Sequence, residues 1–244
     1  MKFAIVTGAS RGLGLALARA LLTDGWHVAG MARGEMTGLA DERFEPLQLD
    51  LGESPVAVAA LDKLLTPEIL ANASEICLIN NAGVVTPVAQ AGNFSTEDIS
   101  GAVALNLTTP IALTNAFLRR TDNSRAVRRI VNISSGAAHT PYTGWSVYCA
   151  TKSALDQFTR CIALEQADKR NPLQIASIAP GVVDTDMQTQ LRNTTLEDFP
   201  IRERFIELHQ SGNLQTTAAT ATKLLAYLAS SAFGNPPVVD LRTL

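Results

Sequence analysis

Short apolar runs alternate with amphipathic stretches along most of the chain. Seven runs have the composition of strands, at residues 3–7, 27–32, 44–49, 76–80, 129–134, 174–179 and 238–241. Several are apolar at consecutive positions, which is typical of parallel strands that helices cover on both faces. Helical periodicity marks residues 13–24, 56–65, 99–118, 147–165 and 216–230. This order predicts an α/β fold, a Rossmann-like doubly wound parallel sheet of about seven strands with helices on both faces.

Residues 1–244 are expected to form a single domain, because no repeat, linker or change of composition divides them. Residues 186–214 interrupt the alternation of strands and helices. They are polar, include Pro200, and show a weak helical pattern at 202–210. An insertion of this size after a late strand often covers a site. We therefore expect 186–214 to be a substrate-binding lid.

Composition excludes several classes of protein. With 46% hydrophobic and 18% charged residues the chain is globular, and its net charge of −3 gives no basic footprint for nucleic acid. Arginines are dense only between 119 and 129, which we interpret as a solvated surface: Arg119, Arg120, Arg125, Arg128 and Arg129. The first strand begins too early for a signal peptide, and no apolar run approaches the length of a membrane span.

The cysteines indicate the cellular compartment of the protein. Cys77, Cys149 and Cys161 are an odd number without metal-ligand spacing, so we expect small core residues and no metal site. A reducing compartment follows, and we predict a cytoplasmic protein.

A glycine-rich segment follows the first predicted strand and opens the first predicted helix. Residues 7–14 read T-G-A-S-R-G-L-G, with glycines at 8, 12 and 14. Glycines let the backbone turn tightly and approach an anion closely, and the helix N-terminus favours negative charge. We therefore expect a pyrophosphate here, contacted by residues of this loop: Gly8, Ser10, Arg11, Gly12, Leu13 and Gly14.

An acid/base pair begins the helix predicted at 147–165. Tyr148 and Lys152 are four residues apart and so share one face. A free phenol has a pKa near 10, and an ammonium at ~5 Å would stabilise the phenolate by roughly 3 kcal/mol. The pair is therefore a plausible proton donor near neutrality. Ser135 lies 13 residues upstream, at the end of a predicted strand.

Together these motifs resemble the short-chain dehydrogenase/reductase family. The glycines follow its G-x-x-x-G-x-G pattern, and Y-x-x-x-K, N-N-A-G at 80–83 and P-G-x-x-x-T at 180–185 occur in order at predicted strand ends. The resemblance implies that Ser135 hydrogen-bonds the substrate carbonyl, with adjacent Ser134 as the rival for that role. It implies that Tyr148 donates the proton, that Lys152 holds the nicotinamide ribose, and that Asn106 holds a water on the lysine.

The same resemblance assigns further contacts to a nicotinamide dinucleotide. Besides the glycine loop, Tyr148 and Lys152, these positions are Asp50, Leu51, Asn80, Ala82, Gly83, Pro180, Gly181, Val183 and Thr185. The second predicted strand ends at Ala32, where an NAD enzyme usually places an acid. Arg33 and Arg11 can instead bind a 2′-phosphate. We therefore predict NADPH, although Glu35 lies nearby and leaves NAD open.

Local segments narrow the expected substrate. Residues 134–138, 144–149 and 179–188 resemble the sepiapterin reductases and bacterial benzil reductases of this family. The resemblance implies reduction of vicinal dicarbonyls or aromatic ketones. Trp145 and Met187 are expected to border the substrate with Ser135 and Tyr148, although core packing also explains the tryptophan. His139 lies near the pocket mouth, and Asp240 stands where a pterin would be anchored, a position at which aspartate is common.

Other functions stay open from the sequence alone. A methyltransferase can share the fold, but it needs no tyrosine–lysine pair. A catalytically silent NADP-binding sensor and a reductase of an unrelated alcohol/ketone pair are the nearer alternatives. We also expect a homodimer or homotetramer, because four residues give the helix at 147–165 more apolar surface than one face needs: Leu155, Phe158, Ile162 and Ala163.

Overall fold

The computed structural model describes all 244 residues and contains one parallel sheet of seven strands, in the order β3-β2-β1-β4-β5-β6-β7. The strands are β1 (Lys2–Thr7), β2 (His27–Ala32), β3 (Phe44–Gln48), β4 (Glu75–Asn80), β5 (Val127–Ile133), β6 (Gln174–Ala179) and β7 (Val238–Asp240). Each predicted run forms a strand, so the doubly wound α/β fold is confirmed. The winding reverses between β1 and β4, which opens a crevice at the carboxyl ends of these strands.

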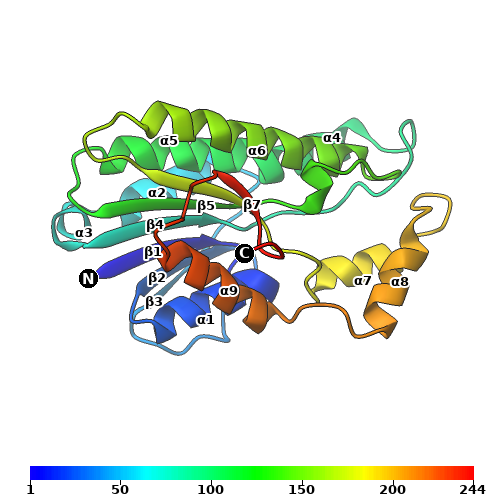
Figure 1. The fold of residues 1–244 in the computed structure, drawn as a ribbon, viewed down its shortest axis with the longest axis horizontal. Helices are drawn as coiled ribbons and strands as arrows, with labels where there is room; N and C mark the ends of the chain where they lie inside the picture. The colour runs from blue at the N-terminus through cyan, green and yellow to red at the C-terminus, as the bar shows by residue number, and fades with distance from the viewer.

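Helices cover both faces of the sheet (Figure 1). One face carries α1 (Gly12–Thr23) and α9 (Thr217–Ala229). The other carries α2 (Ser54–Leu64), α3 (Pro67–Asn72), α4 (Thr96–Val103), α5 (Thr109–Thr121) and α6 (Ser146–Gln166). Two apolar cores of 24 and 20 buried residues lie between the sheet and these layers. α3 was not predicted, because its six residues are too few for periodicity; Thr66 caps it by accepting from the Ile69 amide.

The helix predicted at 99–118 is longer and irregular. α4 begins with a capping box between Ser95 and Asp98 and runs into α5 through a π-helical turn (Ala104–Thr108). By length and composition the stretch Thr96–Thr121 could cross a membrane. Here it packs against α2, α6 and the sheet, with Leu113 and Phe117 fully buried. Core packing therefore accounts for its apolar character.

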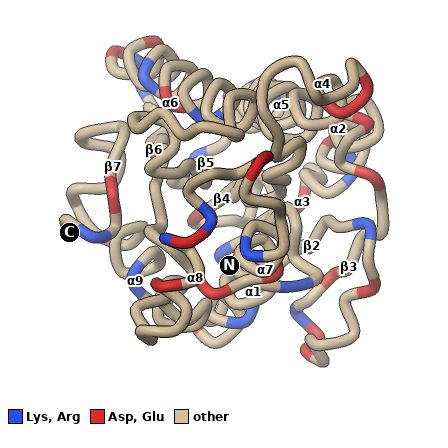
Figure 2. Tube along the Cα trace, turned by 90° about the vertical axis from the view of Figure 1, so that its right-hand side faces the viewer, with Lys and Arg blue, Asp and Glu red and all other residues tan.

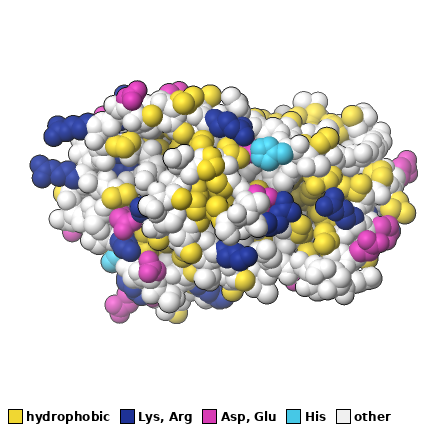
Figure 3. Space-filling view, viewed as in Figure 1, with side chains coloured by type: hydrophobic (Ala, Val, Ile, Leu, Met, Phe, Trp, Pro, Cys, Tyr) yellow, Lys and Arg dark blue, Asp and Glu magenta, His cyan; other side chains and the backbone are white.

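The arginine-rich segment is only partly a solvated surface. β5 begins at Val127, two residues earlier than predicted, so Arg128 and Arg129 belong to the sheet. Arg128 is 2% exposed and donates to the Asn171 carbonyl oxygen. Arg129 pairs with Glu75. The solvated interpretation is wrong for these two, because the Asn171 carbonyl and Glu75 hold both side chains against neighbouring parts of the chain. The face in Figure 3 carries basic, acidic and apolar side chains side by side, without a continuous basic surface.

Residues 186–214 extend past the carboxyl ends of the strands (Figure 1). They contain α7 (Asp186–Arg192) and α8 (Arg202–Gln210), and Figure 2 looks onto this end of the molecule. The predicted helix at 202–210 is confirmed, whereas α7 was not predicted. The loop between the helices rests on Gly144, whose φ is +82° and whose added Cβ would lie 2.1 Å from the Asp198 oxygen. That glycine permits the close contact.

Candidate active site

A cleft with a volume of about 860 Å³ lies at the carboxyl ends of the strands, at the reversal of the sheet. The loops after β1 to β6 line it, and α7 and α8 form its outer wall. A crevice outside the carboxyl ends of parallel strands is where doubly wound sheets bind their ligands. The predicted site residues therefore converge on one place.

The glycine loop forms a cradle that fits a dinucleotide. Gly8 and Gly12 adopt φ of +70° and +56°, and a Cβ on Gly14 would lie 2.1 Å from the Gly8 carbonyl oxygen. No side chain caps the N-terminus of α1, so its first amide groups face the cleft free of a side-chain partner. Such a helix end, reached over glycine backbone, suits a pyrophosphate. The residues present thus fit a nicotinamide dinucleotide.

The loop after β4 is fastened to this cradle. The Thr7 hydroxyl accepts from the Asn81 and Ala82 amides at 2.9 and 3.0 Å, and Asn81 Nδ2 donates to the Thr7 carbonyl at 2.9 Å. Every residue predicted to contact the cofactor lines the cleft except Asn80. Asn80 is 2% exposed and donates to Asn132 inside the sheet. The predicted cofactor contact of Asn80 is therefore corrected: Asn80 still belongs to β4, and its side chain lies inside the sheet. Asn81, the first residue beyond β4, lines the cleft.

Two arginines border the cleft at the end where the second strand stops. Arg33 Nη1 lies 3.9 Å from Asp50 Oδ2, and Arg11 Nη1 lies 3.0 Å from Asp186 Oδ2. All four side chains are more than half exposed. Exposed ion pairs of this kind contribute about 0–1 kcal/mol, so both guanidinium groups can turn to a stronger anion. Glu35 also lines this end.

Tyr148 and Lys152 lie on successive turns of α6 and are both buried, at 6% and 5% exposure. Lys152 Nζ donates to the Ile133 carbonyl oxygen at 2.8 Å and lies 5.7 Å from the centre of the Tyr148 ring. Ser135 lies close enough to Tyr148 to lower the pKa of its phenol, and the Ser135 hydroxyl oxygen accepts from the Ala137 amide at 3.1 Å. The sequence therefore brings the serine, tyrosine and lysine together.

Burial dominates the titration of the pair. It raises the pKa of the Tyr148 phenol to about 12, while the hydrogen bond with Ser135 acts in the opposite direction. It lowers the pKa of the Lys152 ammonium to about 8, and the charge of Asp156 opposes this. The expectation that the ammonium brings the phenol pKa toward neutrality is wrong for this structure. Lys152 faces the tyrosine ring and the Ile133 carbonyl, and the loss of hydration outweighs its charge.

Ser134 also borders the cleft, with a 4% exposed side chain whose hydroxyl has no hydrogen-bond partner. Ser135, and not Ser134, acts on the pKa of the Tyr148 phenol. The geometry therefore favours Ser135 as the serine that faces the reacting oxygen, as predicted.

Asn106 lies beneath the cleft, at the π-helical turn. It is 1% exposed; its Oδ1 accepts from the Val84 amide at 2.8 Å, and its Nδ2 donates to the Val84 carbonyl at 2.9 Å. A Cβ on Gly83 would lie 3.1 Å from Asn106 Oδ1 and 3.7 Å from Lys152 Nζ. Asn106 thus ties the turn to the loop after β4, close to the lysine. A water held between them stays a prediction.

Aromatic rings form the substrate side of the cleft. The Trp145 ring is 5% exposed and lies 4.8 Å from Tyr148, 5.2 Å from Phe199 and 5.7 Å from Phe205, between ring centres. Trp145 therefore both lines the cleft and packs in an aromatic cluster, and Met187 lines the cleft as predicted. Sequence reasoning missed several lining residues, among them the polar side chains of Tyr142, Gln188, Arg204 and Arg242. Only the proximity of Tyr142 to Trp145 could have signalled one of them.

Comparisons with known proteins agree with this geometry. The family model described as short chain dehydrogenase matches residues 2–196. Benzil reductase ((S)-benzoin forming) of Bacillus subtilis (strain 168) is 39% identical over 228 residues, covering 93% of each chain. Sepiapterin reductase of Rattus norvegicus is 36% identical, covering 97% of this chain and 94% of its own. A solved short-chain dehydrogenase/reductase from Burkholderia vietnamiensis is 35% identical, with a TM-score of 0.68 over 99% of this chain and 97% of its own. The chain belongs to the short-chain dehydrogenase/reductase family, oxidoreductases of CH–OH and C=O groups that bind a nicotinamide cofactor.

Proposed function

We propose that the protein is an NADPH-dependent carbonyl reductase for vicinal dicarbonyls or aromatic ketones. The observation that carries the proposal is that Ser135 lines one cleft with buried Tyr148 and Lys152, beside an aromatic wall. A bound reduced nicotinamide supplies the hydride for such a reduction. The residues of the chain bind the carbonyl, stabilise the charge that develops on its oxygen and deliver the proton.

The titration of Tyr148 suits the reductive direction. With its pKa raised to about 12, the phenol is protonated at neutral pH and can donate to the carbonyl oxygen as charge develops there. Ser135 donates to the same oxygen, in a pocket where such hydrogen bonds count for more than in water. Oxidation of the alcohol needs the phenolate. Its rate should therefore rise with pH above neutrality, whereas reduction should not.

The substrate class rests on the wall of the cleft and on the relatives. Trp145 and Phe205 line the cleft next to Tyr148, and fully buried Phe199 packs behind Trp145, so this wall offers an aryl group flat apolar surface beside the carbonyl. The two named relatives are a benzil reductase and a sepiapterin reductase. The test is NADPH oxidation by the purified protein with benzil, a vicinal aliphatic diketone, acetophenone and sepiapterin.

Turnover is expected with benzil ahead of the aliphatic diketone. Cofactor binding without turnover of any carbonyl in the panel would favour the catalytically silent sensor instead. Turnover of the aliphatic diketone alone would remove the aromatic assignment and leave a reductase of another ketone.

Preference for NADPH is proposed from the two arginines. Arg33→Gln should lower the kcat/KM for NADPH by about 10-fold or more, because one charge-assisted hydrogen bond to the 2′-phosphate is lost. The kcat/KM for NADH should stay near the wild-type value. Arg170→Gln, at an exposed position beyond α6, removes the same charge as a control. Equal losses with both cofactors would contradict the phosphate contact.

Residues 186–214 are proposed to be a substrate lid. Gly144→Ala should raise the KM for the ketone by about 10-fold, because a Cβ at that position overlaps the Asp198 carbonyl and displaces the segment. Gly25→Ala is the control: its φ of +81° matches, but nothing lies within 4 Å of the added Cβ. A change of the same size in both variants, measured by steady-state kinetics, would show a backbone effect and no role for the contact.

Assembly into a homodimer or homotetramer stays a prediction. The apolar residues of α6 do not argue for it: Leu155 and Ile162 are 1% and 8% exposed, and Phe158 and Ala163 pack against the chain's own core. Phe158 and Ala163 are only partly buried and Leu164 is 77% exposed, so some apolar surface of α6 remains open. Light scattering measures the assembly, and the cytoplasmic location likewise awaits a fractionation experiment.

A further inference from the structure

A buried carboxylate that the proposed chemistry does not use lies one helical turn beyond Lys152. Asp156 is 1% exposed, and its Oδ1 accepts from the Ser177 hydroxyl of β6 at 2.6 Å. Its Oδ2 makes no regular hydrogen bond, and His139 Nε2 lies 3.2 Å from it. An ionised carboxylate is costly to bury unless positive charge faces it. The position therefore requires a cation.

The charged groups around Asp156 come from three elements. Lys152 lies on the same face of α6, at the spacing where helical side chains are neighbours. His139 follows the short 3-10 turn after β5 and covers the open side of the carboxylate, with its own side chain 55% exposed. Asp240 of β7 is also near His139, but it is paired with Arg242 at 2.5 Å. Lys152 makes no direct ion pair with Asp156, but it is the buried cation one helical turn away from the carboxylate.

We propose that Asp156 is a positioning residue for the reaction, whose buried carboxylate keeps the Lys152 ammonium charged at the ribose end of the site, while His139 shields that carboxylate from solvent. Lys152 donates only to a neutral carbonyl, Ile133 O, so no directly bonded anion offsets its burial. Burial lowers the pKa of Lys152 to about 8, and Asp156 works against that shift. Without the carboxylate, a larger share of the lysine is neutral at neutral pH.

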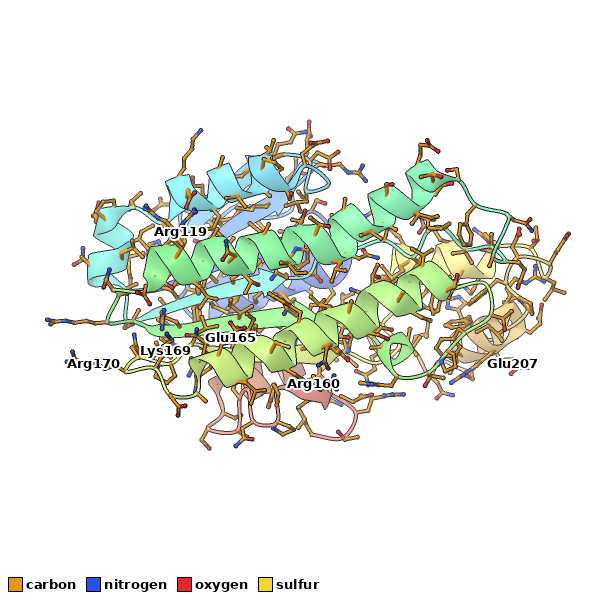
Figure 4. All side chains as sticks on the ribbon, turned by 90° about the horizontal axis from the view of Figure 1, so that it is seen from above. Arg119, Arg160, Glu165, Lys169, Arg170 and Glu207 are labelled. Atoms are coloured by element: carbon orange, nitrogen blue, oxygen red, sulfur yellow. The ribbon has the colours of Figure 1, made fainter.

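The direct test observes the lysine itself. Lys152 is one of five lysines, so a protein with ¹³C-labelled lysine side chains gives few NMR signals, and Lys152→Met identifies the one required. Asp156→Asn should move the titration midpoint of Lys152 down by roughly one to two pH units. Glu165→Gln is the matched control, since it removes one negative charge from an exposed position on α6. Figure 4 shows Glu165 near the carboxyl end of that helix, well away from Glu207 of α8.

The activity arm rests on the proposed function. With benzil and NADPH, Asp156→Asn should shift the alkaline limit of the pH profile down by the same amount as the lysine midpoint, and activity should recover at lower pH. A purely structural role would lower activity equally at every pH. If the wild type turns over no ketone, the proposed function fails, while the NMR titration still decides the role of Asp156.

Folding is controlled with a second neutral variant. Asp156→Ser is smaller, and circular dichroism and thermal denaturation show which variant keeps the fold. An unshifted Lys152 midpoint in either folded variant overturns the proposal. So does a wild-type midpoint below 7, because Asp156 would then not be keeping the ammonium charged.

Discussion

Tyr148→Phe is expected to lower kcat for a ketone by about 10³-fold, because a positioned general acid contributes roughly 10²–10⁴-fold and this hydroxyl also stabilises the developing charge. The phenylalanine keeps the ring that packs 4.8 Å from Trp145, so the wall of the cleft should persist. The dissociation constant of NADPH should change little. Steady-state kinetics with benzil and fluorescence titration of the cofactor measure the two quantities separately.

The matched control is Tyr227→Phe. Tyr227 is another buried tyrosine, whose hydroxyl accepts from the Gly234 amide at 3.2 Å and lies far from the cleft in the α9 core. Tyr227→Phe removes the same hydroxyl group as Tyr148→Phe, so this variant should lose some thermal stability and little activity. If Tyr148→Phe retained more than about a tenth of the wild-type kcat, the phenol would not be the general acid.

Gly14→Ala is expected to abolish detectable binding of the dinucleotide. A methyl group there would lie 2.1 Å from the Gly8 carbonyl oxygen and 2.5 Å from Asn81 Nδ2, far inside contact distance. Relief requires the glycine loop to separate from the loop after β4, which removes the amide cradle. Overpacking of this kind also destabilises a fold by typically about 1–3 kcal/mol. Fluorescence titration with NADPH measures the first effect, and thermal denaturation the second.

Gly101→Ala provides the comparison. Gly101 is also in a helix, and nothing lies within 4 Å of its added Cβ. Alanine there should stabilise α4 slightly, because glycine costs about 1 kcal/mol within a helix. Near-normal NADPH binding by Gly14→Ala would mean that the loop yields at low cost, and the close approach at this glycine would then not determine cofactor binding.

The fold and the centre of the site were predictable because both follow local rules. Consecutive apolar positions marked β1 and β4, and the glycine loop and the tyrosine–lysine spacing sit at strand ends whose positions the sheet order dictates. Parallel strands bring their carboxyl ends to one edge. Residues distant in sequence, such as Ser135 and Gly14, therefore line one cleft.

Features that depend on tertiary packing were not predictable. Whether Asn80 or Asn81 faces the cleft depends on where β4 ends, and two adjacent asparagines do not show that end in the sequence. Of the apolar residues assigned to a surplus face of α6, Leu155 and Ile162 are buried by the rest of the chain, which periodicity alone does not show. The Tyr148 pKa depends on how completely the ring is buried, so a pairwise charge argument from spacing gave the wrong sign.

The position of Trp145 has an optical consequence. The chain has two tryptophans, and the other, Trp26, is buried in the core with its Nε1 donating to Asp24 at 3.0 Å. Trp145 contacts the ring of Tyr148 on α6 and the ring of Phe199 in the segment between α7 and α8. After Trp26→Phe, indole emission would come from Trp145 alone. Any movement of residues 186–214 away from Trp145 would then change the wavelength and intensity of this emission. Opening and closing of the segment could therefore be followed in real time without an added dye.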